Sequence, residues 1–327
     1  MKFHKTYSFD DVLITPRPTE LASRSEVNLE VSYICKHSKA RFAGIPICVA
    51  NMDSVATITM AKALYKHKMW VALHKFIKQE ELEVFLDKEE SKYSFVSMGI
   101  SEEEIVRINK FKFLKGIVID AANGYMNSFL DVIKRIRESF PSSIICAGNV
   151  CTPEGVENII KAGADIAKAG ISNGSHCETK NKTGIGYKQF SVALECGQAA
   201  NELNALCMSD GGCKSPADIC KALGAGSHLV MAGGLFAGYN ECDTAEWDNT
   251  VNPPKMKMYG MSSKTANDKY FGGLQNYRTS EGREGWIECK GSVNDLAQDI
   301  KGSLASCCTY TNTRNLENLY KHCKFTV

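Results

Sequence analysis

One cysteine, Cys177, lies in a stretch that is otherwise polar. The stretch reads AKAGISNGSHCETKNKTG, residues 167–184, whereas most of the 14 cysteines have apolar neighbours. A thiol reacts as its thiolate, which forms more readily near cations or oriented amides, and Lys180 and Lys182 are close in sequence. Position alone leaves two interpretations equally open, a catalytic nucleophile or an incidental exposed thiol. His176 adjoins the cysteine, but adjacent residues seldom face each other, so a Cys–His dyad is disfavoured.

Two groups of glycines form a second feature with chemical potential. Asp210-Gly211-Gly212 and Gly233-Gly234 each follow a short apolar run. Glycines let backbone amides approach an anion closely, although tight turns need them as well. An acidic residue suits ribose hydroxyls better than a phosphate, so these segments together predict a sugar phosphate or nucleotide as ligand.

The apolar runs that precede these segments must position them. Eight runs are bounded by glycine or polar residues: Pro46–Ala50, Met69–His74, Tyr93–Met98, Ile117–Ala121, Ser143–Ala147, Asp165–Ala169, Ala205–Ser209 and His228–Ala232. Continuous rather than alternating apolarity is typical of parallel strands that are buried on both faces. Amphipathic stretches that predict helices follow the runs, at 55–67, 79–89, 101–110, 127–139, 153–162, 187–203, 215–223 and 292–305.

Strand and helix alternating eight times predict an α/β fold, the (β/α)8 TIM barrel, with a doubly wound sheet as the alternative. Active sites of this barrel lie on the loops after the strands, and phosphate often binds after the last two. The 327 residues contain no linker or repeat, so we expect one catalytic domain over 1–327. Residues 239–290, after the eighth strand, are polar with little helix or strand pattern and are expected to form a lid insertion.

Composition excludes several classes of protein. The chain is 44% hydrophobic and 23% charged with a net charge of +2, as in ordinary globular proteins. No long basic run indicates nucleic acid as a partner, and no run approaches the roughly 18 apolar residues of a membrane helix. The first residues lack the apolar core of a signal peptide, so we expect a cytoplasmic protein. Without zinc-type Cys/His spacing, most cysteines, including Cys48, Cys146 and Cys207, should be reduced and buried.

Thirteen segments, in order from one end of the chain to the other, resemble the IMP dehydrogenase/GMP reductase family. They are FDDVLITPRP, SRSEV, ANMDSV, LHK, DAANGY, ICAGNV, GSHCETK, KTGIGY, SDGGC, MAGGLFAG, YGMSS, YRTSEGR and CTY. Two features resemble the reductase branch. The spacing leaves no room for the regulatory domain pair that the dehydrogenases insert, and the lid has Tyr277-Arg278 where they carry Arg-Tyr.

The resemblance implies NADPH-dependent conversion of GMP to IMP and ammonia. Cys177 would attack the purine carbon that bears the amino group and form a covalent thioimidate-type intermediate. Thr179 and Glu281 match the family's proton-transfer pair. Two alternatives stay open: an IMP dehydrogenase, and a catalytically weak paralogue that binds purine nucleotides.

The resemblance also implies binding residues and a homotetramer. The GMP or IMP site would comprise Ser175, Asp210, Gly211, Gly212, Gly233, Gly234, Gly260, Met261, Ser262, Arg278 and Gly282. The NADPH site would comprise Ser23, Arg24, Lys75, Asp120, Ala121, Ala122, Ile171, Tyr277, Ser306, Cys307, Cys308 and Thr309. Of these, Ser23-Arg24 and Ser306–Thr309 would reach a neighbouring subunit's cofactor.

In the family a potassium ion is held by backbone carbonyls of the cysteine loop, which would here include Gly174 and Cys177. This chain has Ser172-Asn173 where the family has a glycine-proline pair, and Lys180 where it has arginine. Loss of a glycine restricts the backbone angles that the loop can adopt. The sequence therefore argues against the potassium ion but retains the residues of the chemistry.

Overall fold

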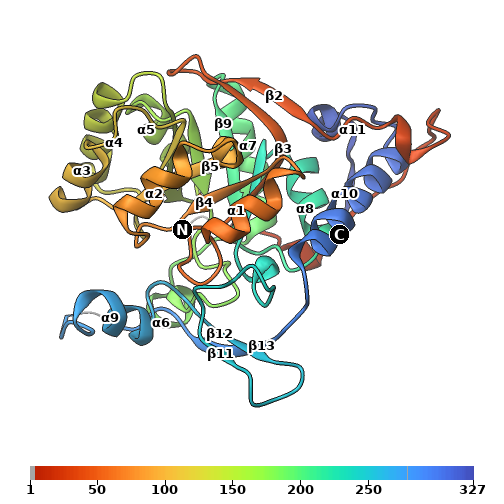
Figure 1. Ribbon diagram of the computed structural model, residues 1–327. Coiled ribbons are helices and arrows are strands. Elements are labelled where there is room, and N and C mark those ends of the chain that lie inside the picture. The colour runs from red at the N-terminus through yellow and green to blue at the C-terminus, as the bar shows by residue number, and fades with distance from the viewer. Residues whose placement is uncertain (1–3, 278) are drawn as a thin grey trace.

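Eight parallel strands form a closed barrel in the computed structural model, which describes residues 4–277 and 279–327 (Figure 1). The strands are β3 (Arg41–Val49), β4 (Met69–Leu73), β5 (Ser94–Met98), β6 (Gly116–Asp120), β7 (Ile144–Val150), β8 (Ile166–Ala169), β9 (Leu206–Asp210) and β10 (Leu229–Ala232). The last strand pairs in parallel with the first, with Val230 opposite Ile47, and this pairing closes the barrel. The predicted TIM barrel is confirmed, and each predicted run overlaps one of these strands.

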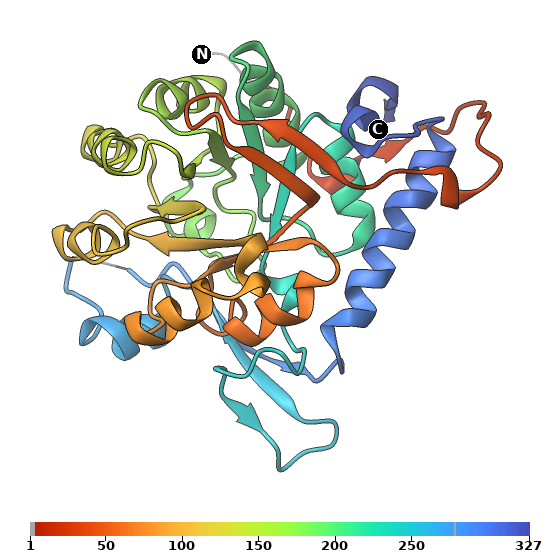
Figure 2. The ribbon, with the colours of Figure 1, turned by 45° about the horizontal axis from the view of Figure 1, so that its top comes forward.

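Helices surround the barrel and lie where the amphipathic stretches predicted them (Figure 2). They are α1 (Ile58–Tyr65), α2 (Gln79–Leu86), α3 (Glu102–Ile108), α4 (Asn127–Ser139), α5 (Pro153–Lys161), α7 (Gln189–Glu202), α8 (Pro216–Gly224) and α10 (Val293–Tyr310). The Thr152 side chain accepts a hydrogen bond from the Gly155 amide at the start of α5, and Ser215 and Asp218 form a capping box at the start of α8. No helix within the described ranges is long and apolar enough to cross a membrane.

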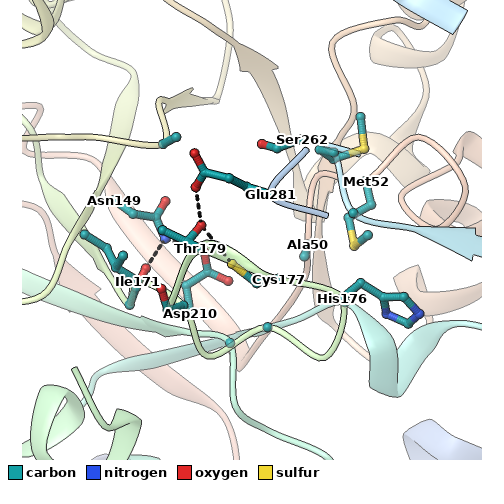
Figure 3. Close-up of a pocket in the computed structure, with 18 of the residues that line it drawn as sticks. Ala50, Met52, Asn149, Ile171, His176, Cys177, Thr179, Asp210, Ser262 and Glu281 are labelled. Carbon is teal, nitrogen blue, oxygen red and sulfur yellow. Dashed lines mark hydrogen bonds between the residues drawn. The ribbon is translucent and has the colours of Figure 1, made fainter. Parts of the chain in front are cut away.

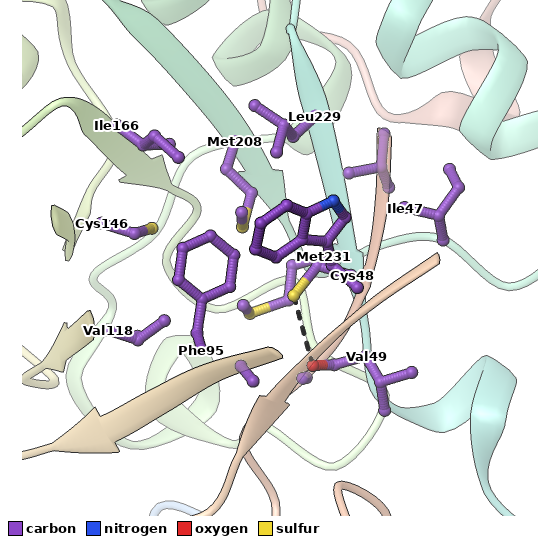
Figure 4. Close-up of a cluster of buried hydrophobic side chains, with 14 of the residues drawn as sticks. Ile47, Cys48, Val49, Phe95, Val118, Cys146, Ile166, Met208, Leu229 and Met231 are labelled. Carbon is purple, nitrogen blue, oxygen red and sulfur yellow. Dashed lines mark hydrogen bonds between the residues drawn. The ribbon is translucent and has the colours of Figure 1, made fainter. Parts of the chain in front are cut away.

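Large apolar side chains fill the barrel interior (Figure 4). The rings of Trp70 and Phe95 lie 4.8 Å apart between centroids, and neither side chain is exposed. Cys48, Cys146 and Cys207 are also fully buried, as their apolar neighbours predicted. Burial raises the pKa of the Cys207 thiol to about 12, which makes this cysteine a small apolar side chain rather than a nucleophile.

Elements outside the barrel were not predicted from the hydrophobic pattern. β2 (Val31–Ile34) pairs antiparallel with the first half of β3, where one face is exposed and the apolar run is interrupted. The other additions are short: β1 (Leu13–Ile14) pairs with β14 (Phe325–Thr326), α6 (Thr179–Thr183) follows Cys177, and α11 (Leu319–His322) lies near the C-terminus.

Residues 239–290 contain more regular structure than their sequence pattern predicted. Three antiparallel strands, β11 (Trp247–Asp248), β12 (Lys255–Tyr259) and β13 (Glu284–Glu288), form a small sheet, and α9 (Lys264–Phe271) follows β12. In Figure 1 this segment projects from one end of the barrel. Its strands are short and α9 is mostly polar, so neither a strand period nor an apolar stripe is visible in the sequence.

A buried carboxylate anchors this segment to the barrel. Asp53 follows β3, and its Oδ2 accepts hydrogen bonds from the Tyr259 hydroxyl (2.5 Å), the Tyr270 hydroxyl (2.5 Å) and Lys269 Nζ (2.9 Å). The Tyr270 ring also stacks on Phe76, which follows β4, with centroids 3.5 Å apart. Burial alone would raise the pKa of Asp53, but the three hydrogen bonds hold it below its ordinary value of 3.8. Asp53 is therefore charged at pH values above 3.8. The stability that its hydrogen bonds contribute is lost only as the pH falls through the lowered pKa of Asp53.

Replacing Asp53 with asparagine should loosen α9 without unfolding the barrel. Hydrogen bonds to a charged group contribute about 1.5–3 kcal/mol, so the local opening equilibrium of α9 should rise at least about tenfold. Hydrogen–deuterium exchange of residues 264–271 at pH 7 measures this opening. Asp268→Asn, which removes an exposed carboxylate from α9 itself, is the matched control and should leave exchange close to wild type. Equal exchange in D53N and wild type would show that Asp53 does not anchor the segment.

Candidate active site

A cavity of about 270 Å³ opens at the carboxyl ends of the strands. Five loops that follow strands line it together with part of the 239–290 segment. The lining residues include Ala50, Asn51 and Met52 after β3, Asp120, Ala121 and Ala122 at β6, Asn149 on β7, residues 170–172 and 174–177 after β8, Asp210 and Gly211 at β9, and Gly233 and Gly234 after β10. Met258, Gly260, Met261, Ser262 and Glu281 line it from the other side.

Cys177 begins a chain of hydrogen bonds that ends on a carboxylate. Its Sγ donates to Thr179 Oγ1 over 3.3 Å, and Thr179 Oγ1 donates to Glu281 Oε2 over 2.6 Å. Figure 3 shows Thr179 between the other two side chains at the cavity. The direction of both bonds leads a proton from the thiol toward the carboxylate. This geometry is what activation of a thiol nucleophile requires.

Backbone contacts hold the segment that carries Glu281 against the cysteine loop. The Glu178 amide donates to the Glu281 carbonyl over 2.7 Å, and the Arg283 amide donates to the His176 carbonyl over 3.0 Å. A Cβ on Gly260 would lie 2.8 Å from the same His176 carbonyl oxygen, so this approach requires glycine. The loop and the segment thus form one continuous wall of the cavity.

Two side chains near the cysteine, Arg283 and His176, have roles that the sequence did not indicate. Arg283 donates from Nε (2.9 Å) and Nη2 (2.7 Å) to the Ser175 carbonyl. His176 Nδ1 lies 3.0 Å from Ser175 Oγ, and in Figure 3 the ring points away from Cys177. Burial, followed by the charge of Arg283, lowers the pKa of His176. His176 therefore orients Ser175 and forms no dyad with Cys177.

The loop before the cysteine keeps a left-handed turn without glycine. Ser172 has φ = 72°, and its hydroxyl donates to the Ile185 carbonyl over 2.6 Å. Asn173 Nδ2 lies within hydrogen-bond distance of the carbonyls of Ile171 (3.0 Å) and Tyr187 (2.7 Å) and of Gln189 Oε1 (2.7 Å). Loss of the glycine therefore does not exclude a left-handed residue at this position, because Ser172 adopts one with its side chain hydrogen-bonded.

A buried lysine forms the floor of the cavity. Lys168, on β8, is 2% exposed, and its Nζ lies 2.5 Å from Asp120 Oδ1, 2.5 Å from Asn149 Oδ1 and 3.1 Å from Asp210 Oδ2. Asn149 Nδ2 also donates to Asp210 Oδ2 over 2.8 Å. Burial alone would lower the pKa of Lys168, but the charges of Asp120 and Asp210 raise it. The lysine is therefore charged, and it was not found from sequence because it lies inside an otherwise apolar run.

Sixteen of the residues expected from sequence line this one cavity. They are Cys177, Thr179, Glu281, Gly174, Ser175, Asp210, Gly211, Gly233, Gly234, Gly260, Met261, Ser262, Asp120, Ala121, Ala122 and Ile171. Gly282 forms a β-bridge with Cys177 at the rim. Gly212, Lys75 and Tyr277 do not line the cavity; Lys75 pairs with Glu104 over 2.5 Å, and Tyr277 is exposed. Arg278 lies outside the described residues.

The residues expected to reach a neighbouring subunit are not in this cavity. Ser23 and Arg24 are exposed at a short helical turn, 24–26, which packs against α10. Ser306, Cys307 and Thr309 are partly exposed on α10, whereas Cys308 is buried. The two segments therefore share one side of the molecule.

Comparisons with known proteins agree with these features. A family model for the IMP dehydrogenase / GMP reductase domain matches residues 6–327. The chain is 44% identical over 326 residues to a GMP reductase of Caenorhabditis elegans, with 97% of this chain and 90% of the relative aligned. It is 41% identical over 324 residues to GMP reductase 1 of Mus musculus, with 97% of this chain and 93% of the relative covered. The chain belongs to the IMP dehydrogenase / GMP reductase family.

A solved structure has the same fold at lower sequence identity. The crystal structure of a cysteine-to-alanine variant of GMP reductase from Trypanosoma brucei, in complex with guanosine 5'-monophosphate, superposes with a TM-score of 0.87. The match covers 99% of this chain and 95% of that one at 20% identity. Both activities in the family's name are oxidoreductions of a purine nucleotide, so this chain is an oxidoreductase of that family.

Replacing Asn173 with alanine should destabilise the cysteine loop. The side-chain amide has two protons for the three acceptors around it, so acceptors would be left unsatisfied, which costs about 1–3 kcal/mol. Urea unfolding measures the loss, and the rate of Cys177 alkylation by iodoacetamide should rise as the loop opens. Asn109→Ala, at an exposed asparagine after α3, is the control. Wild-type stability together with wild-type alkylation in N173A would contradict the proposed support of the loop by this side chain.

Proposed function

We propose that this enzyme reduces GMP to IMP and ammonia with NADPH as reductant. The observation that carries the proposal is the hydrogen-bonded chain from Cys177 through Thr179 to Glu281 at the cavity wall. The names of the relatives, GMP reductases at 40–44% identity over nearly the whole chain, support the same substrate.

The nucleotide would be held by two chemically different sides of the cavity. Ser175 and the amides of Gly233 and Gly234 would bind the phosphate, and Gly211 lines the cavity beside Asp210. A Cβ on Gly234 would lie 2.5 Å from Ser175 Oγ, so the absence of a side chain allows these loops to meet. Asp210 would accept hydrogen bonds from the ribose hydroxyls, because a carboxylate suits hydroxyls and repels phosphate.

The remaining substrate contacts would come from Gly212 and the 239–290 segment. Gly260, Met261, Ser262, Arg278 and Gly282 would contact the base or the phosphate. We propose that the chain is one catalytic domain over 1–327 in which residues 239–290 act as a lid, since residues of this segment line the cavity and carry Glu281.

The chain of hydrogen bonds explains how the thiol can act. The proton of Cys177 passes through the Thr179 hydroxyl to Glu281, and the thiolate adds to the purine carbon that carries the amino group. The carbon–nitrogen bond breaks as the amino group takes that proton and leaves as ammonia, which gives a thioimidate on Cys177. When a hydride has been added to the same carbon, the carbon–sulfur bond breaks, and its electron pair returns to sulfur as IMP leaves.

NADPH supplies that hydride when it is bound and is oxidised to NADP⁺. Asp120, Ala121, Ala122 and Ile171 line the cavity beside the nucleotide residues and would hold the nicotinamide half, with Lys75 and Tyr277 farther out. Ser23, Arg24 and Ser306–Thr309 lie outside this cavity on one side of the molecule. We propose that they complete the cofactor site of a neighbouring subunit in a homotetramer.

We propose that this loop closes without the potassium ion of the family. The proposed ligands of that ion are backbone carbonyls that include Gly174 and Cys177, and the Gly174 carbonyl accepts the Cys177 amide over 3.0 Å. The side chains of Ser172 and Asn173 supply the donors that close the loop. We propose that these side chains make the ion unnecessary.

Purified protein with GMP and NADPH tests the function directly. We expect loss of NADPH absorbance with release of ammonia in equal amount. Cys177→Ala should abolish this turnover while GMP still binds, as measured by calorimetry, because the thiol forms the covalent bond but is not needed for affinity. Cys289→Ala, at a partly buried thiol of the lid, is the matched control.

Each alternative gives a different result in the same assay. Turnover only with IMP and NAD⁺ would identify a dehydrogenase, and GMP binding without either activity would identify a nucleotide-binding protein. Full activity of C177A would refute the covalent mechanism.

Activity should not depend on potassium. We expect equal rates in potassium, sodium and choline chloride at one ionic strength, because the loop is closed by Ser172 and Asn173. Thermal unfolding midpoints in the three salts provide a second readout and should also agree. A rate that falls when sodium replaces potassium, with a matching fall in the midpoint, would show that the ion is still required.

A further inference from the structure

The cavity floor holds a charged side chain to which the proposed chemistry gives no role. Lys168 lines the cavity yet is 2% exposed, and its ammonium group is met by Asp120, Asn149 and Asp210. An ammonium group has three protons, and these three oxygens account for all of them. Lys168 is therefore neither a free proton donor nor a direct ligand for a substrate.

The four residues come from four consecutive strands of the barrel. Asp120 ends β6, Asn149 is on β7, Lys168 on β8 and Asp210 ends β9. The lysine thus connects two acids that are separated by two strands. Asn149 reinforces the connection, since its Oδ1 accepts from Lys168 and its Nδ2 donates to Asp210.

The two acids belong to different ligand sites in the proposed function. Asp210 would bind the ribose of GMP, and Asp120 lies in the segment that would hold NADPH. Their side chains are 19% and 38% exposed, so both reach the cavity from the buried lysine. Both ligands carry phosphates, so two acids without a counter-charge would oppose binding of either ligand.

We propose that Lys168 is a positioning residue that fixes Asp120 and Asp210 as oriented carboxylates and so sets the affinity for GMP and for NADPH together. The proposal rests on the proposed function for the identity of the two ligands. Besides Asp120 and Asp210, the ionisable groups close to Lys168 are the thiols of Cys146 on β7 and Cys48 on β3. Burial raises the pKa of both thiols, so neither of them supplies a negative charge to the lysine.

Lys168→Met tests the role because it keeps the length of the side chain and removes the charge. Removing one partner of a buried, hydrogen-bonded charge pair costs about 2 kcal/mol or more, so KM should rise about thirtyfold or more for GMP and for NADPH alike. The acid limb of the kcat/KM profile, where activity falls as carboxylates are protonated, should move to higher pH, because Lys168 no longer offsets the charge of the two carboxylates and only Lys75 still acts on Asp120. The surface variant Lys161→Met, at an exposed ion pair of α5, should leave all parameters unchanged.

Two further measurements separate positioning from general stability. Lys168→Arg keeps the charge, so its acid limb should stay at the wild-type pH even where KM rises, and this variant remains informative if K168M does not fold. Adding Asp120→Asn to K168M removes one of the repelling charges and should return the acid limb toward the wild-type pH.

Folded K168M with wild-type KM values and pH profile would overturn the inference, as would a fall in kcat alone. A shifted acid limb in K168R would overturn it as well. Absence of GMP reduction in the wild type would instead refute the proposed function. GMP affinity of K168M, measured by calorimetry without NADPH, would then still decide whether Lys168 supports the nucleotide site.

Discussion

Closure of the barrel is the constraint on which the rest of the site depends. The parallel pairing of β10 with β3 forces the eight strands to end on one rim. Residues that are far apart in sequence but follow strands are thereby collected around one cavity, from Met52 after β3 to Gly234 after β10. The apolar interior below this rim packs the strands against one another. The barrel fold is therefore enough to bring these cavity residues together.

The barrel rim alone does not bring Cys177 and Glu281 together, because the two residues lie on different segments that meet through a tertiary contact. Thr179 and Glu281 are 102 residues apart, and their hydrogen bond forms where the lid meets the cysteine loop. Asp53 holds α9 and Tyr259 of this segment against the barrel, while backbone bonds donated by Glu178 and Arg283 hold residues 281–283 against the cysteine loop. In the proposed mechanism, activation of Cys177 would therefore depend on the position of the 239–290 segment, because this segment carries the proton acceptor Glu281.

The sequence predicted the alternating strands and helices of the barrel. It missed the elements whose position depends on individual polar contacts. Continuous apolar runs identified all eight barrel strands, since burial on both faces leaves a clear pattern. The lid sheet and α9 leave none, because they are short and bound by specific polar contacts such as those of Asp53. Cys177 was found from its polar neighbours, and its partners Thr179 and Glu281 only from the family resemblance. Lys168 was missed because a charged residue in a buried strand interrupts an apolar run without revealing what neutralises it.

The distribution of charge in the cavity separates two kinds of recognition. The floor contains one cation and two carboxylates, so it keeps a net negative charge and favours hydroxyl and amide donors over phosphates. The opposite side, with Ser175, Gly233 and Gly234, presents a hydroxyl and backbone amides. In the proposed function a nucleotide would satisfy both sides in one direction, with its ribose toward Asp210 and its phosphate toward the glycines. That direction would place the base at the remaining wall, where Cys177 and residues of the 239–290 segment lie. The buried lysine matters here because, without it, the two carboxylates would lose the cation that they share and the negative charge of the floor would be greater.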